Sequence, residues 1–167
     1  MSALECPSHD DFPDLIPQDV NSVDGKFKSN NDTEFPQEVS VIVCYNPLLD
    51  LILAVHRKDD PSDWGLPGGK IEEGESPLCA AMRELVEETC YAVVSDRYMR
   101  LLDKRMEGEF SVYVFIVEYD NLAIHTGPSE QNYAWVKPAL LTDGSFADFN
   151  TQLFSDIASE LQRQKKH

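Results

Sequence analysis

The segment "WGLPGGKIEEGESPLCAAMRELVEETCYAV", residues 64–93, places an adjacent pair of glycines and six glutamates in one short stretch. Ser76 followed by Pro77 predicts the start of a helix, because a serine hydroxyl caps free backbone N–H groups and proline is favoured at the first helical position. We expect the helix to run over 77–89. Like charges on one helix repel each other, so a stretch this acidic either faces water or is matched by bound cations.

The acidic residues of this predicted helix share one face, because Glu84, Glu87 and Glu88 are spaced i, i+3 and i+4. Another face supplies the buried stripe and carries Leu78, Met82, Leu85 and Thr89. Three aligned carboxylates form a surface of hard oxygen ligands suited to Mg²⁺ or Mn²⁺. Glutamate pairs on helices are also common as plain solvated faces, so the spacing of the surrounding residues has to decide.

From the second glycine onward the spacing reads G-x5-E-x7-R-E-L-x-E-E, and it fits seven fixed positions: Gly69, Glu75, Arg83, Glu84, Leu85, Glu87 and Glu88. This pattern resembles the Nudix box, G-x5-E-x7-R-E-U-x-E-E-x-G-U with U a bulky apolar residue, which defines the Nudix hydrolases. The flanks "LPGGKIEEGES" and "AAMREL" are similar to that family as well. With the strands expected before and after the box, the resemblance spans about 38–160.

The resemblance implies an α/β/α sandwich with a mixed β-sheet, in which the box forms a loop–helix–loop that holds divalent cations against a diphosphate. By position it assigns Glu84, Glu87 and Glu88 as catalytic metal-binding residues, with the carbonyl of Gly69 as a further ligand. The implied cofactor is Mg²⁺, with Mn²⁺ as the alternative. Which glutamate is the principal ligand stays open.

Other residues receive supporting roles from the same resemblance. Arg83 is expected to pair with Glu75 or Glu87 and to hold the carboxylates in register, which makes Glu75 structural first. A catalytic base outside the box is common in the family, and Glu130, five residues before Trp135, is the best candidate, although a lone loop carboxylate is often merely solvated.

Two residues near the box are candidates for substrate binding. Arg57 ends a predicted strand at a place where relatives contact substrate phosphate, and its alternative is a surface ion pair. Trp64 has a ring that could stack on a nucleobase, while burial in the core or at its rim is the alternative.

The box departs from the family pattern at its end, where Cys90 replaces the usual glycine. A glycine just past a helix normally adopts a left-handed cap, which we expect cysteine to adopt at a cost of about 1 kcal/mol. We therefore expect a local adjustment of the helix exit and slightly lower stability.

The rest of the chain divides at residue 36. Residues 1–36 contain eight acidic residues but only two lysines, and they also contain four prolines. We expect a loosely ordered extension, with a lid or an arm of a homodimer as the alternative. Residues 37–167 form the predicted Nudix domain. Its expected strands are 40–45 with its lead-in, 51–57, 98–105, 110–119 and 132–136, and its expected second helix is 146–164.

The formal net charge of −16 makes a broad electrostatic grip on nucleic acid or on an anionic membrane surface improbable. The first residues lack both a basic region and an apolar region, so no secretory signal is expected, and we expect a cytoplasmic protein that acts on a small-molecule nucleotide.

Together these observations predict a Mg²⁺-dependent hydrolase of a phosphoanhydride in a nucleoside diphosphate linked to another group. A MutT-like pyrophosphohydrolase of nucleoside triphosphates fits best. The alternatives are a hydrolase of ADP-sugars or dinucleoside polyphosphates, and a non-catalytic Nudix module that only binds nucleotides.

Overall fold

The computed structural model describes residues 35–124, 127–130 and 132–164. The chain divides into two compact units, Met1–Pro36 and Gln37–His167, and all described helices and strands belong to the second unit. The extension predicted for 1–36 lies almost wholly outside the described residues, so that prediction stays open.

A seven-stranded mixed sheet forms the centre of the second unit. Its strands are β1 (Gln37–Asn46), β2 (Leu51–His56), β3 (Trp64–Gly65), β4 (Gly68–Lys70), β6 (Arg100–Glu107), β7 (Phe110–Glu118) and β9 (Tyr133–Val136). The main order is β3-β2-β1-β7-β6, with β4 paired to β1 and β9 paired to β2. Strands β1 and β7 run parallel and the other pairs are antiparallel, which confirms the mixed sheet.

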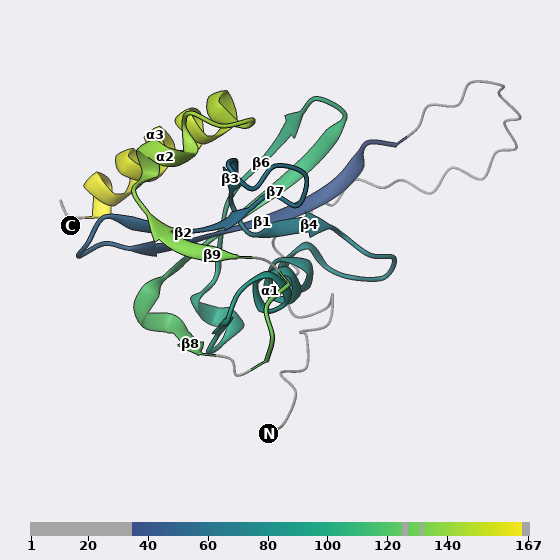
Figure 1. Ribbon diagram of the computed structural model, residues 1–167, viewed down its shortest axis with the longest axis horizontal. Helices are drawn as coiled ribbons and strands as arrows, with labels where there is room; N and C mark the ends of the chain where they lie inside the picture. The colour runs from purple at the N-terminus through teal and green to yellow at the C-terminus, as the bar shows by residue number, and fades with distance from the viewer. Residues whose placement is uncertain (1–34, 125–126, 131, 165–167) are drawn as a thin grey trace, which may run out of the picture. The chain divides into compact units, whose positions relative to one another are not determined.

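Helices cover both faces of this sheet, as Figure 1 shows. The helix α1 (Pro77–Glu88) lies on one face, whereas α2 (Pro138–Leu141) and α3 (Ala147–Gln164) lie on the other. Successive side chains of β1 enter opposite cores because strand residues alternate in direction. Ile42 packs in the cluster that holds Leu85 of α1, and Val43 packs in the cluster that holds Leu153 of α3. The predicted α/β/α sandwich is therefore present.

The helix α1 begins as predicted and ends one residue early. Ser76 Oγ accepts a hydrogen bond from the Cys79 N–H at 3.2 Å, and proline occupies the first turn. After Glu88, Thr89 is extended, and its hydroxyl donates to the Leu85 carbonyl at 2.6 Å while accepting from the Tyr91 N–H at 3.0 Å. The threonine side chain thus satisfies the helix exit.

The left-handed cap expected at Cys90 is wrong. Among the non-glycine residues in the described part of the chain, only Asp50 has a positive φ. Because Thr89 closes the helix in an extended conformation, the next residue needs no glycine-like backbone, and the expected cost at this position does not arise.

Most predicted elements are found with shifted ends. The strand expected over 98–105 begins instead with a 3₁₀ turn at Asp96–Tyr98 and continues as β6. Four short strands were not predicted: β3, β4, β5 (Tyr91–Val93) and β8 (Leu122–Ile124), the last two forming a separate antiparallel pair. With two or three residues each, they are too short to show a period. None of the described helices is both long enough and apolar enough to cross a membrane.

Candidate active site

The glycine pair of the opening segment brings backbone against the acidic helix. Strand β4 pairs with β1, so that Gly68 lies opposite Val41 and Gly69 opposite Ser40. A Cβ atom at Gly68 would lie 2.5 Å from the Ser40 carbonyl oxygen, and one at Gly69 would collide with the carboxylate of Glu84. Only glycine therefore fits at Gly68 without a backbone shift, and at Gly69 the main chain of β4 approaches the Glu84 carboxylate closely.

Arg83 connects three of the box glutamates. Its Nε and Nη2 atoms donate to the two oxygens of Glu75 at 2.9 and 3.1 Å. Its Nη1 atom donates to Glu84 at 2.9 Å and to Glu87 at 3.1 Å. The paired guanidinium lowers the pKa of the Glu75 carboxyl below its usual range. The expected pairing of Arg83 with Glu75 and Glu87 is present, and it also includes Glu84.

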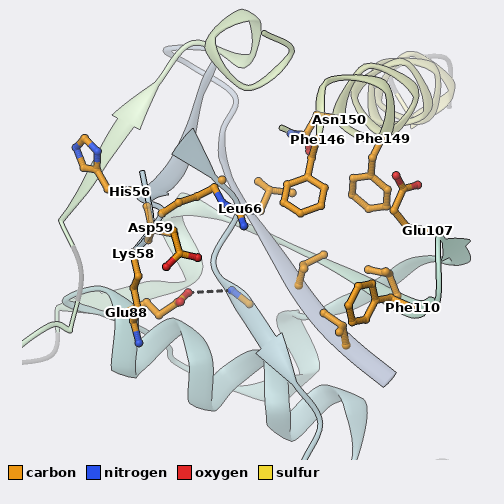
Figure 2. Close-up of a pocket in the computed structure, with 17 residues that line it drawn as sticks. His56, Lys58, Asp59, Leu66, Glu88, Glu107, Phe110, Phe146, Phe149 and Asn150 are labelled. Atoms are coloured by element: carbon orange, nitrogen blue, oxygen red, sulfur yellow. Dashed lines mark hydrogen bonds between the residues drawn. The ribbon is translucent and has the colours of Figure 1, made fainter. Parts of the chain in front are cut away.

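Glu88 is the most buried carboxylate of the box, with 7% of its surface exposed. The Gly68 N–H donates to its Oε2 atom at 2.9 Å (Figure 2). Its pKa is raised to about 7, chiefly by burial and also by the charge of Glu84, while the Gly68 hydrogen bond opposes both effects. Burial also raises the pKa of Glu84. Two carboxylates thus face a cost of ionisation that a nearby cation would offset.

The donor set fits a divalent metal ion, although the described residues contain no ready-made group of three acidic, histidine or cysteine side chains. Arg83 occupies Glu84 and Glu87, while Gly68 holds Glu88. The space beside Gly69 that a methyl group would fill faces the Glu84 carboxylate. The Glu84 carboxylate thus lies against the backbone of Gly69, and hard carboxylate and carbonyl oxygen atoms are the ligands that Mg²⁺ prefers. The assignment of the ligands stays a prediction.

The loop that carries Glu130 lies at the end of α1. The Glu130 N–H donates to the Glu87 carbonyl at 2.7 Å, which fixes this loop to the box helix. The Glu130 carboxylate lies 3.3 Å from the Lys58 ammonium, and both side chains are more than half exposed. Both charges reach Glu88, whose pKa Lys58 lowers and Glu130 raises. The chain thus brings Glu130 beside the box, while its role as a base stays a prediction.

A pocket of about 360 Å³ extends from Glu88 across the sheet to α3. In Figure 2, Glu88, Lys58 and Asp59 lie at one end, called here the box end. At the other end, called here the aromatic end, lie Phe110, Phe146, Phe149, Glu107 and Asn150. Side chains of β1 and β7 form the apolar wall between them: Val39, Val41 and Val112. One cavity therefore joins the acidic helix to a group of aromatic rings.

Arg57 lines this pocket, whereas Trp64 is not among its lining residues. The Arg57 guanidinium lies 4.9 Å from the centre of the Phe146 ring, and its Nε atom is 3.5 Å from a carboxylate oxygen of Asp63. The Trp64 ring centre lies 3.7 Å from that of His56, and the side chain packs against the core under α3. The indole therefore packs at the rim of the core, and its role in substrate binding stays a prediction.

Sequence reasoning missed the residues of the aromatic end and the buried Asp63. Asp63 accepts a hydrogen bond from the Ser145 hydroxyl at 2.5 Å, which ties the loop before β3 to the start of α3. A signal for the aromatic end was present, because Phe146, Phe149 and Asn150 follow the spacing i, i+3, i+4. A buried asparagine on an apolar helix face needs polar partners, and that requirement was the available clue.

Comparison with known proteins finds nucleotide hydrolases. A dihydroneopterin triphosphate diphosphatase of Escherichia coli is 35% identical over 83 residues, which cover 49% of this chain and 55% of that protein. A putative 8-oxo-dGTP diphosphatase of Bacillus subtilis is 58% identical over 91 residues, which cover 54% and 60%. The chain thus spans little more than half the length of these curated relatives.

Solved structures share the architecture. The MutT structures from Aliivibrio salmonicida and Vibrio cholerae align with a TM-score of 0.57 and 26% identity over 74% of this chain and 98% of the other. An ADP compounds hydrolase aligns with a TM-score of 0.59, 19% identity, and 77% and 74% coverage, which shows the fold alone. The sequence model of the NUDIX domain matches residues 34–156. The chain therefore belongs to the Nudix family.

Proposed function

We propose that this protein is a Mg²⁺-dependent pyrophosphohydrolase that cleaves a phosphoanhydride bond of a nucleoside triphosphate. The observation that carries the proposal is the single pocket that joins the box end to the aromatic end. A nucleotide has the same two-part character, with an aromatic base at one end and a polyphosphate at the other. The relatives named as triphosphate diphosphatases support the same substrate class.

The pocket gives the substrate one favourable direction. Aromatic rings stack on nucleobases, so the base belongs against the phenylalanines. The phosphates then extend past the Arg57 guanidinium, which lies near the Phe146 ring, toward the box end, where Lys58 lines the wall. This orientation places the phosphoanhydride beside Glu88 and beside the backbone of Gly68.

A divalent ion held by Glu84, Glu87, Glu88 and the Gly69 carbonyl would neutralise phosphate charge and lower the pKa of a bound water. Arg83 holds Glu84 and Glu87 in register through one nitrogen, and Glu75 fixes the guanidinium by two hydrogen bonds. Glu130, on the loop anchored to Glu87, accepts the proton of the attacking water. These residues bind, orient and move a proton, and none of them forms a covalent bond with the substrate.

The net charge of the protein agrees with this chemistry. A chain with a formal charge of −16 repels a polyphosphate at long range unless local cations screen it. Metal ions among the box glutamates provide that screening, which accounts for the crowding of like charge in residues 72–88.

A release assay tests the proposal. The full chain is incubated, with Mg²⁺ and with EDTA, against canonical and oxidised deoxynucleoside triphosphates, ADP-ribose, nucleotide sugars and dinucleoside polyphosphates. We expect a nucleoside monophosphate and pyrophosphate from triphosphates in Mg²⁺ and no product in EDTA. Faster turnover of ADP-sugars or dinucleoside polyphosphates would overturn the substrate class. Nucleotide binding without any turnover would indicate a non-catalytic module.

A further inference from the structure

The aromatic end contains a carboxylate for which the hydrolysis described above has no use. Glu107 is the last residue of β6, is half-buried, and lines the pocket beside Phe149 (Figure 2). Within the part of the chain that the structure describes, its carboxylate takes part in no hydrogen bond or ion pair. Its neighbours on the hairpin strand differ in this respect, since Arg105 pairs with Asp103 and Asp156.

A second acceptor lies at the same end. Asn150 is 2% exposed, and its Nδ2 atom donates to the Leu141 carbonyl at 2.9 Å. This hydrogen bond orients the amide and leaves the Oδ1 atom without a donor among the described residues. No buried polar side-chain atom of the described residues lacks a partner, so this oxygen is open to the pocket that Asn150 lines. Glu107 and Asn150 thus offer acceptors at this end, while the Arg57 guanidinium near the Phe146 ring offers donors.

An unpaired carboxylate beside aromatic rings favours a flat ligand whose edge presents donors to it. A carboxylate can accept two parallel hydrogen bonds, and such charge-assisted pairs are stronger than neutral ones. Guanine presents a ring N–H beside an exocyclic amino group, and hypoxanthine keeps the ring N–H but lacks that amino group. Adenine presents a ring nitrogen acceptor beside its amino group, which would face the carboxylate lone pairs.

We propose that Glu107 is a specificity-determining residue that favours nucleobases with adjacent ring N–H and amino donors, the guanine type, over bases that lack this pair. The inference rests on the proposed function for its substrate, but it concerns the aromatic end alone. Glu107 lies at the opposite end of the pocket from Glu88, so it selects the base and leaves the reacting phosphates to the box residues.

The test compares guanosine, inosine and adenosine nucleotides on the full chain and on E107Q. Glutamine preserves the volume of the side chain but replaces one acceptor with a donor. For the unaltered chain we expect kcat/KM for the guanosine triphosphate to exceed that for the inosine and adenosine triphosphates about 10-fold or more. In E107Q the guanosine-to-inosine ratio should fall to about 1, and the adenosine rate should rise relative to guanosine. A purely structural role for Glu107 would lower all three rates together.

Glu109 provides the matched control. It lies on the same hairpin, is exposed, and is not among the residues that line the pocket, so E109Q should leave the three ratios unchanged. A thermal melt of both variants establishes that they fold.

Binding of the monophosphates in EDTA separates this inference from the proposed function, because it needs no turnover. We expect tighter binding of GMP than of IMP or AMP, with the difference lost in E107Q. Preferential binding of GMP without any triphosphate hydrolysis would refute the proposed function and support the inference. Equal binding of the three monophosphates, or ratios that E107Q does not change, would overturn the inference while leaving any observed hydrolysis in place.

Discussion

The box around Arg83 and the aromatic end of the pocket are assembled from different distances along the chain. Every residue that hydrogen-bonds to the Arg83 side chain lies between Lys70 and Glu87. The aromatic end joins the hairpin at Glu107 and Phe110 to the start of α3, and three phenylalanine rings line it. A short segment held by many hydrogen bonds can fix the positions of charged groups for chemistry. A site built from distant elements can change its side chains, and so its preference for a nucleobase, without disturbing those groups.

If the box glutamates perform the chemistry, substitution of one of them should lower turnover more than any other change. We expect E88Q to lower kcat about 10²- to 10⁴-fold, because the substitution removes an oxygen charge from the predicted metal site. The measurement is steady-state kinetics in Mg²⁺ on a triphosphate. The matched control is E73Q, because Glu73 is an exposed glutamate of the loop that precedes α1. Rates like those of the unaltered chain in both E87Q and E88Q would refute the assignment.

The same glutamate should govern the pH dependence of stability in the absence of metal. The pKa of Glu88 is raised from 4.5 to about 7 in the folded protein, so the folded state binds more protons than the unfolded state between these values. Stability therefore falls as the pH rises from about 4.5 to about 7, by up to about 3 kcal/mol.

Urea unfolding in EDTA at pH 5 and pH 8 tests this prediction. E88Q should lose less stability than the unaltered chain over this interval, and Mg²⁺ should restore stability to the unaltered chain at pH 8. Parallel pH profiles for the two proteins would contradict the prediction.

Substitution of Arg83 should show how much catalysis depends on the hydrogen bonds that hold the box glutamates together. Lysine keeps the charge but lacks the planar guanidinium. In Arg83 two nitrogen atoms of this group donate to Glu75, and the third donates to Glu84 and Glu87. We expect R83K to lower kcat about 10- to 100-fold and to weaken Mn²⁺ binding by a similar factor. R97K is the control, because the Arg97 side chain contacts the ring and hydroxyl of Tyr98 at an exposed site. Unchanged Mn²⁺ affinity in R83K would show that the guanidinium does not position the ligands.

The aromatic end should respond through KM instead. Truncation of Phe146, which is 42% exposed and lies under the Arg57 guanidinium, removes a stacking surface. We expect F146A to raise KM about 10-fold with kcat changed less than about 3-fold. F154A is the matched control on α3, since Phe154 packs against the core and is not among the residues that line the pocket. A fall in kcat without a change in KM would show that the two ends do not divide the work in this way.

The same contrast explains what could be predicted from the sequence. Gly69, Glu75, Arg83 and the three helix glutamates lie within 20 residues, so their spacing reveals their arrangement. The resemblance of the box to the Nudix family implied the sandwich, and the strand and helix periods located most of its elements. The position of Glu107 at the same end of the pocket as Phe149 depends on how β6 and α3 are placed in the fold, which no local sequence pattern encodes. Trp64 was ambiguous for a related reason, because only the packed structure shows His56 covering its ring.

The smallest effect is expected where the box departs from its family pattern. If Cys90 occupied a left-handed cap, glycine would relieve strain and stabilise the protein. Its backbone is not left-handed, and the Thr89 hydroxyl already satisfies the helix exit. Glycine would then only increase the conformational freedom of the unfolded chain and remove a hydrogen bond. The bond lost is the one between the Cys90 thiol and Tyr133, and this bond raises the pKa of the Tyr133 phenol. We expect C90G to lower the free energy of unfolding by about 0.5–1 kcal/mol with kcat unchanged, as measured by urea unfolding. An increase in stability would show that the cysteine is strained after all and that the threonine cap is incomplete.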